Sequence, residues 1–428
     1  MLLVYMLAVS CEGWLCPDKK NKFDRVMILY AAGCNSLSSS IQENIRDLKT
    51  GFIPEKKDKR ALIVVSHSPA GYLTYTPETE SYIIRLYKSK AQVVADTVKT
   101  IPAGKFLTQP GVMKDVLSYV KDSFKSEHYG MIFSSHATGW LPEGYFNNPT
   151  SQGGGGSSWT WSAPRRSLSL PEGAVPYYEP EHEEGLPLTK SIGQEDTYHG
   201  ETKISYEMSQ LDFAANIPMH LDYLIFDACF MGCIETAYEL RNVVDLVAFS
   251  PTEVLQYGFQ YKTLASHLLE GEPDLYKACK DFFDKYDQET GIMRSATVTL
   301  VNCSKLENLK SVCSDLFQRY REAIAAVNPE EVQPYFRSYH HWFYDMEDIL
   351  LKAGINATEK ANLENALSQC IVYKAATPTF YLSTLGAGSG FPINVYSGFS
   401  MYLPCNGSPD LDNFYKTLAW NKATGLVQ

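Results

Sequence analysis

Short apolar runs typical of buried strands alternate along the chain with segments whose apolar residues recur at helical spacing. Arg25–Ala31 predicts a first strand, and Ile41, Ile45 and Leu48 mark the helix behind it, which Gly51 ends. This alternation predicts an α/β fold with a mostly parallel, doubly wound sheet of about six strands flanked by helices. The five further strands are predicted at 61–66, 129–136, 221–226, 243–250 and 295–302.

Several segments depart from this alternation. Tyr72–Ile84 alternates polar and apolar residues, which predicts a hairpin. Between 141 and 200, seven prolines and the run Gly153–Gly156 interrupt every apolar period, which predicts an exposed, partly mobile insertion. Tyr206–Ile217 then predicts a helix. The apolar runs Phe380–Leu385 and Val395–Leu403 either extend the sheet or form a small appended unit.

These patterns predict three parts in the 428-residue chain. Residues 1–22 form a leader and linker, and residues 23–300 form the core with its insertion at 141–200. Residues 301–428 form an extension of the same unit, with helices predicted at 306–327 and 339–353.

The first ten residues are apolar but shorter than the roughly 20 residues of a membrane-spanning helix. Ala8-Val9-Ser10-Cys11 resembles a bacterial lipobox, in which Cys11 is the acylated residue. We therefore expect an exported bacterial protein that is secreted or held on a membrane by this lipid alone. An ordinary amino-terminal apolar segment is the alternative.

Composition narrows the classes of partner and cofactor. The net charge is -11 without a long basic block, which argues against a nucleic-acid partner. Most of the ten cysteines stand singly in apolar contexts, as reduced buried thiols do. The cysteines and histidines do not fall at ligand spacing, so no metal or cofactor is predicted. Asp345, Glu347 and Asp348 predict a solvated helix face rather than a cation site.

Cys229 and His136 are the residues best placed for chemistry. Cys229 follows the apolar run Leu221–Phe226, and His136 ends the strand that begins at Tyr129. Because parallel strands end at one edge of a sheet, both side chains are expected there. An imidazole and the helix expected after Gly232 would favour the reactive thiolate. A buried structural cysteine and a core histidine are the alternative.

The sequence resembles the clostripain-like cysteine peptidases, a family of the caspase-like fold group. The segments that carry the resemblance are RVMILYAAGCNSLS (25–38), SSHATGW (134–140), FDACFMG (226–232) and YSGFSMYLP (396–404). It implies a caspase-like three-layer sandwich with a C-terminal extension. It also implies a peptidase in which His136 and Cys229 form the catalytic dyad, with backbone amides holding the oxyanion.

The resemblance further implies cleavage after Arg or Lys. Asp227 matches the family's aspartate two residues before the cysteine, where its carboxylate would bind a basic side chain. Capping of a neighbouring loop is the alternative for Asp227. Glu253 is the only acid in Ser250–Tyr261, which departs from the Gly-rich, Trp-containing pocket wall of the family. Ala137 replaces a glycine whose amide contributes to the oxyanion hole.

Relatives are commonly activated by self-cleavage after a basic residue between the histidine and the cysteine. In this chain Arg166 is the first choice and Lys190 the second. Calcium helps some relatives, but no calcium loop is visible here. We expect protein or peptide substrates and a monomer. The competing interpretation is a catalytically weak or inactive binding protein of the same fold at the cell surface, which Ala137 and the altered pocket wall favour.

Overall fold

The structure is a computed structural model that describes residues 22–67, 80–145, 171, 174–176, 194–199, 202–337, 341–381 and 390–428. Its centre is a nine-stranded sheet with the order β13-β11-β10-β9-β5-β1-β2-β3-β4. The five central neighbours are parallel. They are β10 (Val244–Phe249), β9 (Leu221–Asp227), β5 (Tyr129–Ser134), β1 (Arg25–Ala31) and β2 (Arg60–His67).

Antiparallel strands complete both sides of the sheet. β3 (Ser81–Ser89) and β4 (Gln92–Ile101) form a hairpin beside β2, and β11 (Thr297–Asn302) and β13 (Ile371–Ala376) lie beside β10. The hairpin therefore lies later than the Tyr72–Ile84 prediction, of which residues 72–79 are outside the described residues. The sheet has nine strands rather than about six, because this hairpin and β13 were not predicted as sheet strands.

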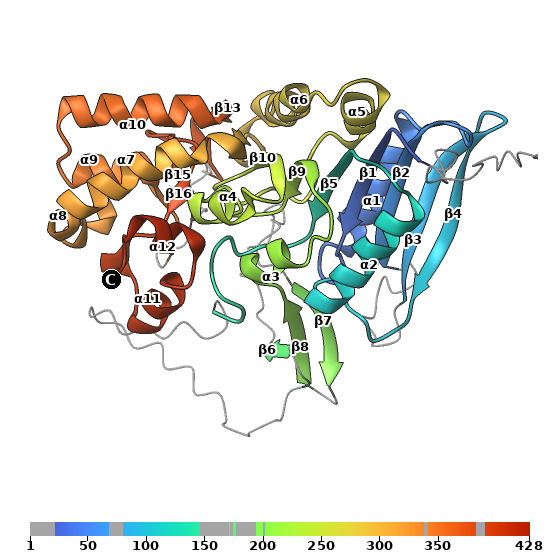
Figure 1. The fold of residues 1–428 in the computed structure, drawn as a ribbon, viewed down its shortest axis with the longest axis horizontal. Coiled ribbons are helices and arrows are strands. Elements are labelled where there is room, and N and C mark those ends of the chain that lie inside the picture. Colours follow the sequence, from blue (N-terminus) through green and yellow to red (C-terminus); the bar gives the residue numbers. More distant parts are fainter. Residues whose placement is uncertain are drawn as a thin grey trace, which may run out of the picture.

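Helices cover both faces of the sheet, as the layered prediction required. α1 (Ser38–Thr50) packs against α5 (Tyr261–Ala265), and α3 (Gln210–Ala215) packs against α4 (Ile234–Leu240). In Figure 1, α5 and α6 (Leu275–Asp287) lie above the strands and α3 lies below them. Right-handed crossovers explain the two layers, because the chain moves one way from β1 to β2 and the other way from β5 through β9 to β10.

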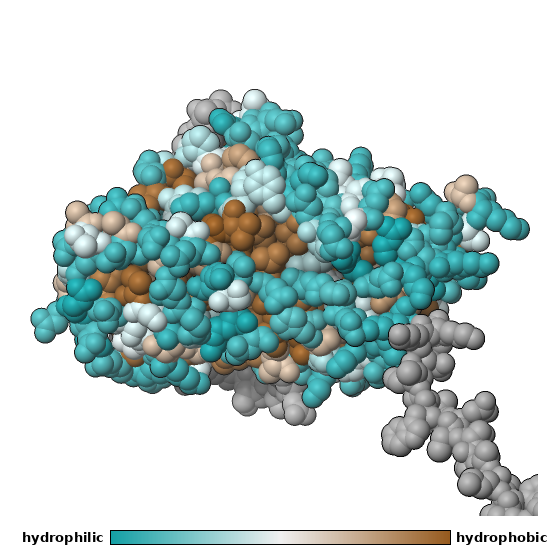
Figure 2. Space-filling view, turned by 45° about the horizontal axis from the view of Figure 1, so that its top comes forward, coloured by the Kyte–Doolittle hydropathy of each residue, from teal (hydrophilic) through white to brown (hydrophobic). Residues whose placement is uncertain are grey.

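The central strands form the middle of the core. Val26–Ala31 of β1 are at most 1% exposed. Strands covered on both faces have no polar side to show, which is why their sequences are continuous apolar runs. Figure 2 shows a mainly hydrophilic surface with separate hydrophobic areas. No helix in the described ranges combines the length and apolar character needed to cross a membrane.

The end of the predicted insertion is structured. β6 (Ala174–Pro176), β8 (Thr202–Glu207) and β7 (Gln194–His199) form a sheet in that order. Glu195, Asp196 and Thr197 are buried, so the prediction of an exposed segment is wrong for this end. The helix predicted at Tyr206–Ile217 is limited to α3. Arg166, Lys190 and Cys11 lie outside the described residues.

The remaining α-helices of the described residues are α2 (Pro110–Ser123), which precedes the C-terminal extension, and α7 (Leu306–Arg319), α8 (Arg321–Ala325), α9 (Met346–Lys352), α10 (Ala357–Cys370), α11 (Pro409–Tyr415) and α12 (Ala419–Thr424) within it. The extension is joined to α4 through buried Glu235, whose Oε1 accepts hydrogen bonds from the Tyr402 amide and the Tyr415 hydroxyl. Core and extension therefore share one interior.

Two short strand pairs include parts of the late apolar runs Phe380–Leu385 and Val395–Leu403. β12 (Tyr344–Asp345) pairs with β16 (Ser400–Met401), and β14 (Thr379–Phe380) pairs with β15 (Phe391–Pro392). They are appended units and do not extend the central sheet.

The acidic stretch at the start of α9 is not the solvated face that the sequence predicted. Asp345 and Asp348 are buried, and Asp345 Oδ2 accepts hydrogen bonds from the Tyr335 hydroxyl and the Ser397 amide. Asp345 also caps α9 by accepting a bond from the Asp348 amide. A carboxylate with several donors is stable in the interior, which the helical pattern could not reveal.

Candidate active site

His136 and Cys229 lie at equivalent positions beyond the ends of two paired strands. β5 ends at Ser134 and β9 ends at Asp227, and these two residues are partners in the parallel register. Each candidate follows its strand end by two residues. The sheet therefore delivers the imidazole and the thiol to the same edge, as the sequence predicted.

The turns that follow the two residues touch each other. A side chain added at Gly139 would place its Cβ only 2.7 Å from the Phe230 carbonyl oxygen. Gly139 has φ +63°, and Phe230 has φ +60°, a left-handed conformation that is costly for a bulky residue. The Phe230 ring is held by stacking on Phe343 at 4.5 Å between ring centroids. Packing thus fixes a strained turn immediately after Cys229.

The Cys229 thiol faces the main chain of Val254. Its Sγ accepts a hydrogen bond from the Val254 amide at 3.0 Å and lies 3.7 Å from the Val254 carbonyl oxygen. Cys229 is wholly buried. The helix expected after Gly232 is α4, which begins at Ile234, and the Gly232 amide donates to the Ser250 carbonyl. The amide at the sulfur therefore comes from the loop after β10.

His136 is 1% exposed, and its Nε2 lies 3.0 Å from the Ser36 hydroxyl. Ser36 belongs to the loop between β1 and α1, about a hundred residues earlier in the chain. No sequence pattern linked the two, so the serine was not predicted as part of the site. Ala137 is buried, and its φ is not left-handed, so alanine fits here without backbone strain.

Asp227 lies at this edge but has no exposed surface. Its Oδ2 accepts hydrogen bonds from the Tyr261 hydroxyl at 2.6 Å and the Ser134 hydroxyl at 3.1 Å. Gly258, with φ +55°, passes so close that a Cβ there would lie 2.4 Å from Asp227 Oδ2. Burial, and then the neighbouring Asp227 charge, raise the pKa of Tyr261, so its hydroxyl stays a donor. In this state the Tyr261 hydroxyl and the Gly258 turn both lie against the Asp227 carboxylate.

Glu253 is paired with a basic residue of the chain itself. Its fully buried carboxylate forms an ion pair with Arg337, whose Nε lies 3.0 Å from Oε2. The Arg337 guanidinium also lies over the Tyr381 ring, 4.6 Å from its centroid. The sequence singled out Glu253 but gave no signal for Arg337. This pairing neutralises the acid that was predicted in the pocket wall.

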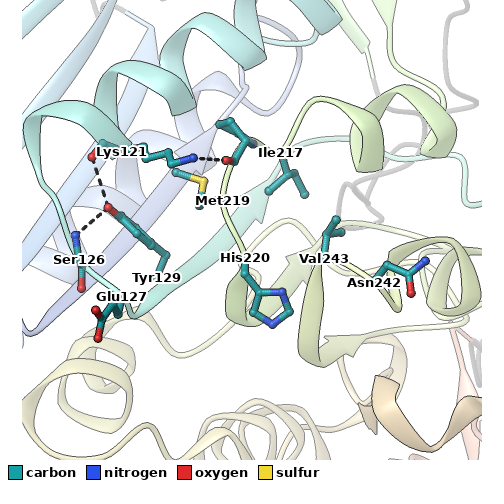
Figure 3. A pocket seen from close by; sticks show the side chains of 10 residues that line it. Lys121, Ser126, Glu127, Tyr129, Ile217, Met219, His220, Asn242 and Val243 are labelled. Carbon is teal, nitrogen blue, oxygen red and sulfur yellow. Dashed lines mark hydrogen bonds between the residues drawn. The ribbon is translucent and has the colours of Figure 1, made fainter.

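A separate shallow cavity of about 360 Å³ opens at the opposite edge of the sheet. Figure 3 shows its lining, where Lys121 donates to the Pro218 carbonyl and the Tyr129 hydroxyl bonds the main chain near the end of α2. Tyr129 and Val243 stand at the amino ends of β5 and β10. This cavity contains neither candidate residue.

The described residues contain no group of three or more His, Cys, Asp or Glu side chains arranged to hold a metal ion.

The fold has the layers of solved cysteine peptidases. An inactive zymogen C11 protease from Parabacteroides distasonis superimposes with a TM-score of 0.71 at 22% identity, covering 96% of this chain and 99% of that one. A secreted C11 cysteine protease from Bacteroides thetaiotaomicron, in complex with an irreversible peptide inhibitor, gives a TM-score of 0.71 at 19% identity, covering 94% and 99%. These likenesses establish the fold class, an α/β sandwich of the C11 protease type.

The sequence comparisons give the family. A family model described as the clostripain family matches residues 178–424, which include β9 and Cys229. Clostripain from Hathewaya histolytica is 25% identical over 275 residues, 59% of this chain. The match covers 44% of that protein, so the chain spans less than half the length of this relative. The chain belongs to the clostripain family, as the sequence motifs predicted.

Proposed function

We propose that the chain is a cysteine endopeptidase in which Cys229 is the nucleophile and His136 the general acid and base. The observation that carries this proposal is the β5–β9 register, which brings both residues to equivalent positions at one sheet edge. The thiolate attacks the peptide carbonyl carbon and forms a thioester, while His136 protonates the departing amine. Water then hydrolyses the thioester, with His136 accepting its proton. Backbone amides, including that of Ala137, are proposed to hold the oxyanion.

The described state fits a latent enzyme. The buried Cys229 thiol is bonded to the Val254 main chain, so a peptide carbonyl cannot reach it until the loop after β10 shifts. One structural relative is itself described as an inactive zymogen. We propose activation by self-cleavage at Arg166, or at Lys190. Both precede β7, so a cut at either site leaves β7 and β8 joined to Cys229.

Cleavage after Arg or Lys is proposed through Asp227. The ion pair with Arg337 occupies Glu253, which leaves Asp227 as the acid two residues from the nucleophile. A guanidinium or ammonium group would replace the Tyr261 hydroxyl as a donor to this carboxylate, provided that the Gly258 turn moves with the loop. We further propose a lipid anchor on Cys11, which the lipobox-like motif Ala8-Val9-Ser10-Cys11 supports.

A panel of fluorogenic peptides that end in Arg, Lys, Asp or Leu tests this function. Purified protein is assayed before and after limited trypsin nicking, with the trypsin then blocked by a proteinaceous inhibitor. We expect hydrolysis of the Arg and Lys peptides that is absent from an identically treated Cys229→Ala protein. Asp227→Asn should slow Arg hydrolysis more than Leu hydrolysis, because a charge-assisted hydrogen bond contributes about 1.5–3 kcal/mol.

The result also separates the two function classes. No turnover in either state would favour a binding protein of the same fold, for which the enclosed Cys229 thiol is the supporting observation. Equal losses on Arg and Leu peptides would give Asp227 a structural role.

Mass spectrometry tests the activation step. The wild type should be recovered as two fragments cut after Arg166 or Lys190, and Cys229→Ala as one chain. A cut that persists in Cys229→Ala would point to another protease. An active but intact wild type would refute the latent state.

A further inference from the structure

Three serines at the start of α1 and in the loop before it connect the parts of the candidate site. The Ser36 hydroxyl lies 3.0 Å from His136 Nε2, and the Ser38 hydroxyl lies 2.7 Å from His67 Nε2 at the end of β2. The Ser40 hydroxyl donates to Gln256, in the loop after β10 that encloses the Cys229 thiol. This short segment therefore touches the proposed acid-base residue, a neighbouring strand end and the proposed pocket wall.

The β7–β8 hairpin fixes the loop that carries Ser36. Glu195, which is 1% exposed, accepts hydrogen bonds from the Cys34 amide at 3.2 Å and the Thr108 amide at 2.9 Å. The Asp196 amide donates to the Cys34 carbonyl at 2.8 Å. Cys34 is thus held through both its amide and its carbonyl, two residues before Ser36. Both contacts to Cys34 are made by β7, at the carboxyl-terminal end of the 141–200 insertion.

A hydroxyl at Nε2 has a definite chemical effect on an imidazole. When Ser36 accepts the Nε2 proton, the neutral ring is kept in the tautomer whose Nδ1 can take up a proton. The same hydroxyl accepts equally well from the imidazolium, so it stabilises the charged ring and also limits its rotation. It neither gains nor loses a proton itself.

We infer that Ser36 is a positioning residue for His136 and that Glu195 of the β7–β8 hairpin keeps it in place. The catalytic meaning of this inference rests on the proposed function, but its effect on the histidine does not. Among the described residues, the titratable groups near this edge include Cys34, His67, Glu195, Asp196, Asp227, Cys229 and Tyr261. A comparison of variants at position 36 leaves them unchanged.

The first test measures the histidine without any turnover. In a Cys229→Ala background, the nine histidines are labelled with ¹³C in the ring and titrated by NMR. The His136 signal is assigned by its loss in Cys229→Ala/His136→Gln. Adding Ser36→Ala should lower the His136 pKa by about half to one pH unit, because a lost hydrogen bond no longer stabilises the imidazolium. Ser36→Thr keeps the hydroxyl and should restore the value.

Matched controls separate the contact from general damage to the loop. Ser39 is exposed in the first turn of α1, so Ser39→Ala should leave the His136 titration unchanged. Glu195→Ala should lower the His136 pKa as Ser36→Ala does, although the Ser36 hydroxyl is still present. An unchanged titration in Ser36→Ala would overturn the assignment of Ser36, and an unchanged titration in Glu195→Ala would overturn the hairpin's part.

The second test uses the active enzyme. Ser36→Ala should reduce kcat about tenfold with little change in KM. The alkaline limb of its pH–rate profile should move to lower pH by the shift found by NMR. Ser36→Thr should recover both. Wild-type kinetics in Ser36→Ala would refute the positioning role. An NMR shift in a protein that hydrolyses no peptide would support the Ser36 contact while refuting the proposed function, so the two failures are distinguishable.

Discussion

The two edges of the central sheet carry the same residue types in opposite environments. At the amino edge, His128 pairs with Asp222 and His220 with Asp245, each with an N–O distance of 2.9 Å. Both histidine side chains are about half exposed, at 55% and 51%. At the carboxyl edge, by contrast, His67, His136 and Asp227 are nearly inaccessible, and hydroxyl groups lie within hydrogen-bond distance of their ring nitrogens and carboxylate.

Histidine and aspartate occur at both edges, so residue type does not distinguish the edge where chemistry is expected. The burial of these side chains does. An exposed pair is screened by water and gains little, whereas a buried group depends strongly on each contact. The pKa of His67 illustrates this, because burial lowers it from 6.5 to about 4. Strand direction explains which edge is buried. The loops after parallel strands gather at the carboxyl edge and cover it.

The largest expected effect concerns catalysis. Cys229→Ala should abolish peptide hydrolysis and His136→Ala should reduce it by roughly four orders of magnitude or more, because each removes a proposed reacting group. His220→Ala at the amino edge should leave kcat/KM within about twofold. Activity assays with circular dichroism to confirm folding provide the measurement.

Two other cysteines serve as controls for this experiment. Cys233, buried four residues after Cys229, and Cys405, which is exposed, should both tolerate replacement by alanine without loss of the chemical step. An inactive Cys233→Ala beside an active Cys229→Ala would show that the nucleophile was assigned wrongly.

The central part of the fold could be predicted because both faces of its strands are covered. Arg25–Ala31 was predicted as β1 with the same bounds. The β3–β4 hairpin was misplaced because its turn uses Lys90 and Ala91 at φ +51° and +63°, where Asn or Gly would have given a signal. β7 was missed because its burial depends on docking against Cys34, which no local pattern records.

The residues of the candidate site were likewise predicted only in part. Strand ends and family motifs indicated His136 and Cys229, because each follows a continuous apolar run. Ser36 and Arg337 were missed because each is recognised only through a partner some 80 to 100 residues away. Sequence periodicity describes neighbours along one element, whereas these contacts depend on how loops from different strands meet.

The second effect is on stability. Asp227→Ala should lower the free energy of unfolding by about 4 kcal/mol, since it leaves the buried Ser134 and Tyr261 hydroxyls without their shared acceptor. Asp222→Ala removes the exposed partner of His128 and should cost at most about 1 kcal/mol. Urea unfolding of both variants in the Cys229→Ala background measures the difference. Similar losses would mean that the carboxyl edge is not the more strongly coupled of the two.

The third effect is on pH dependence and concerns His67, which Ser38 contacts. Between pH 6.5 and about 4 the unfolded chain binds a proton at this position that the folded chain does not. The contribution of His67 to the free energy of unfolding is therefore at its full value above pH 6.5. It decreases as the pH is lowered, by up to about 3 kcal/mol in total. His67→Gln should remove this loss, and His220→Gln should not.

Buried acids act in the opposite direction over part of that range. Burial raises the pKa of Glu195 and Glu235 to about 7 and that of Asp196 to about 6, so these groups stabilise the folded chain as the pH falls. The measurement is therefore the difference between His67→Gln and its parent, from urea unfolding at pH 7.5 and 4.5. A difference that does not change with pH would show that folding does not lower the pKa of His67.

The smallest effect is expected for the exposed pair of His220 and Asp245. A double-mutant cycle with His220→Ala and Asp245→Ala should give a coupling free energy of at most about 0.5 kcal/mol at pH 6, because solvent screens the pair and two mobile side chains must be ordered to form it. The coupling should also vanish in 1 M salt, where the Debye length is about 3 Å. The same cycle on Tyr261→Phe and Asp227→Asn should give a larger coupling that salt does not change, because water does not reach that contact. If the His220–Asp245 coupling matched it, exposure would not explain the difference between the two edges, and the choice of the carboxyl edge as the reactive one would rest on the β5–β9 register and the family motifs.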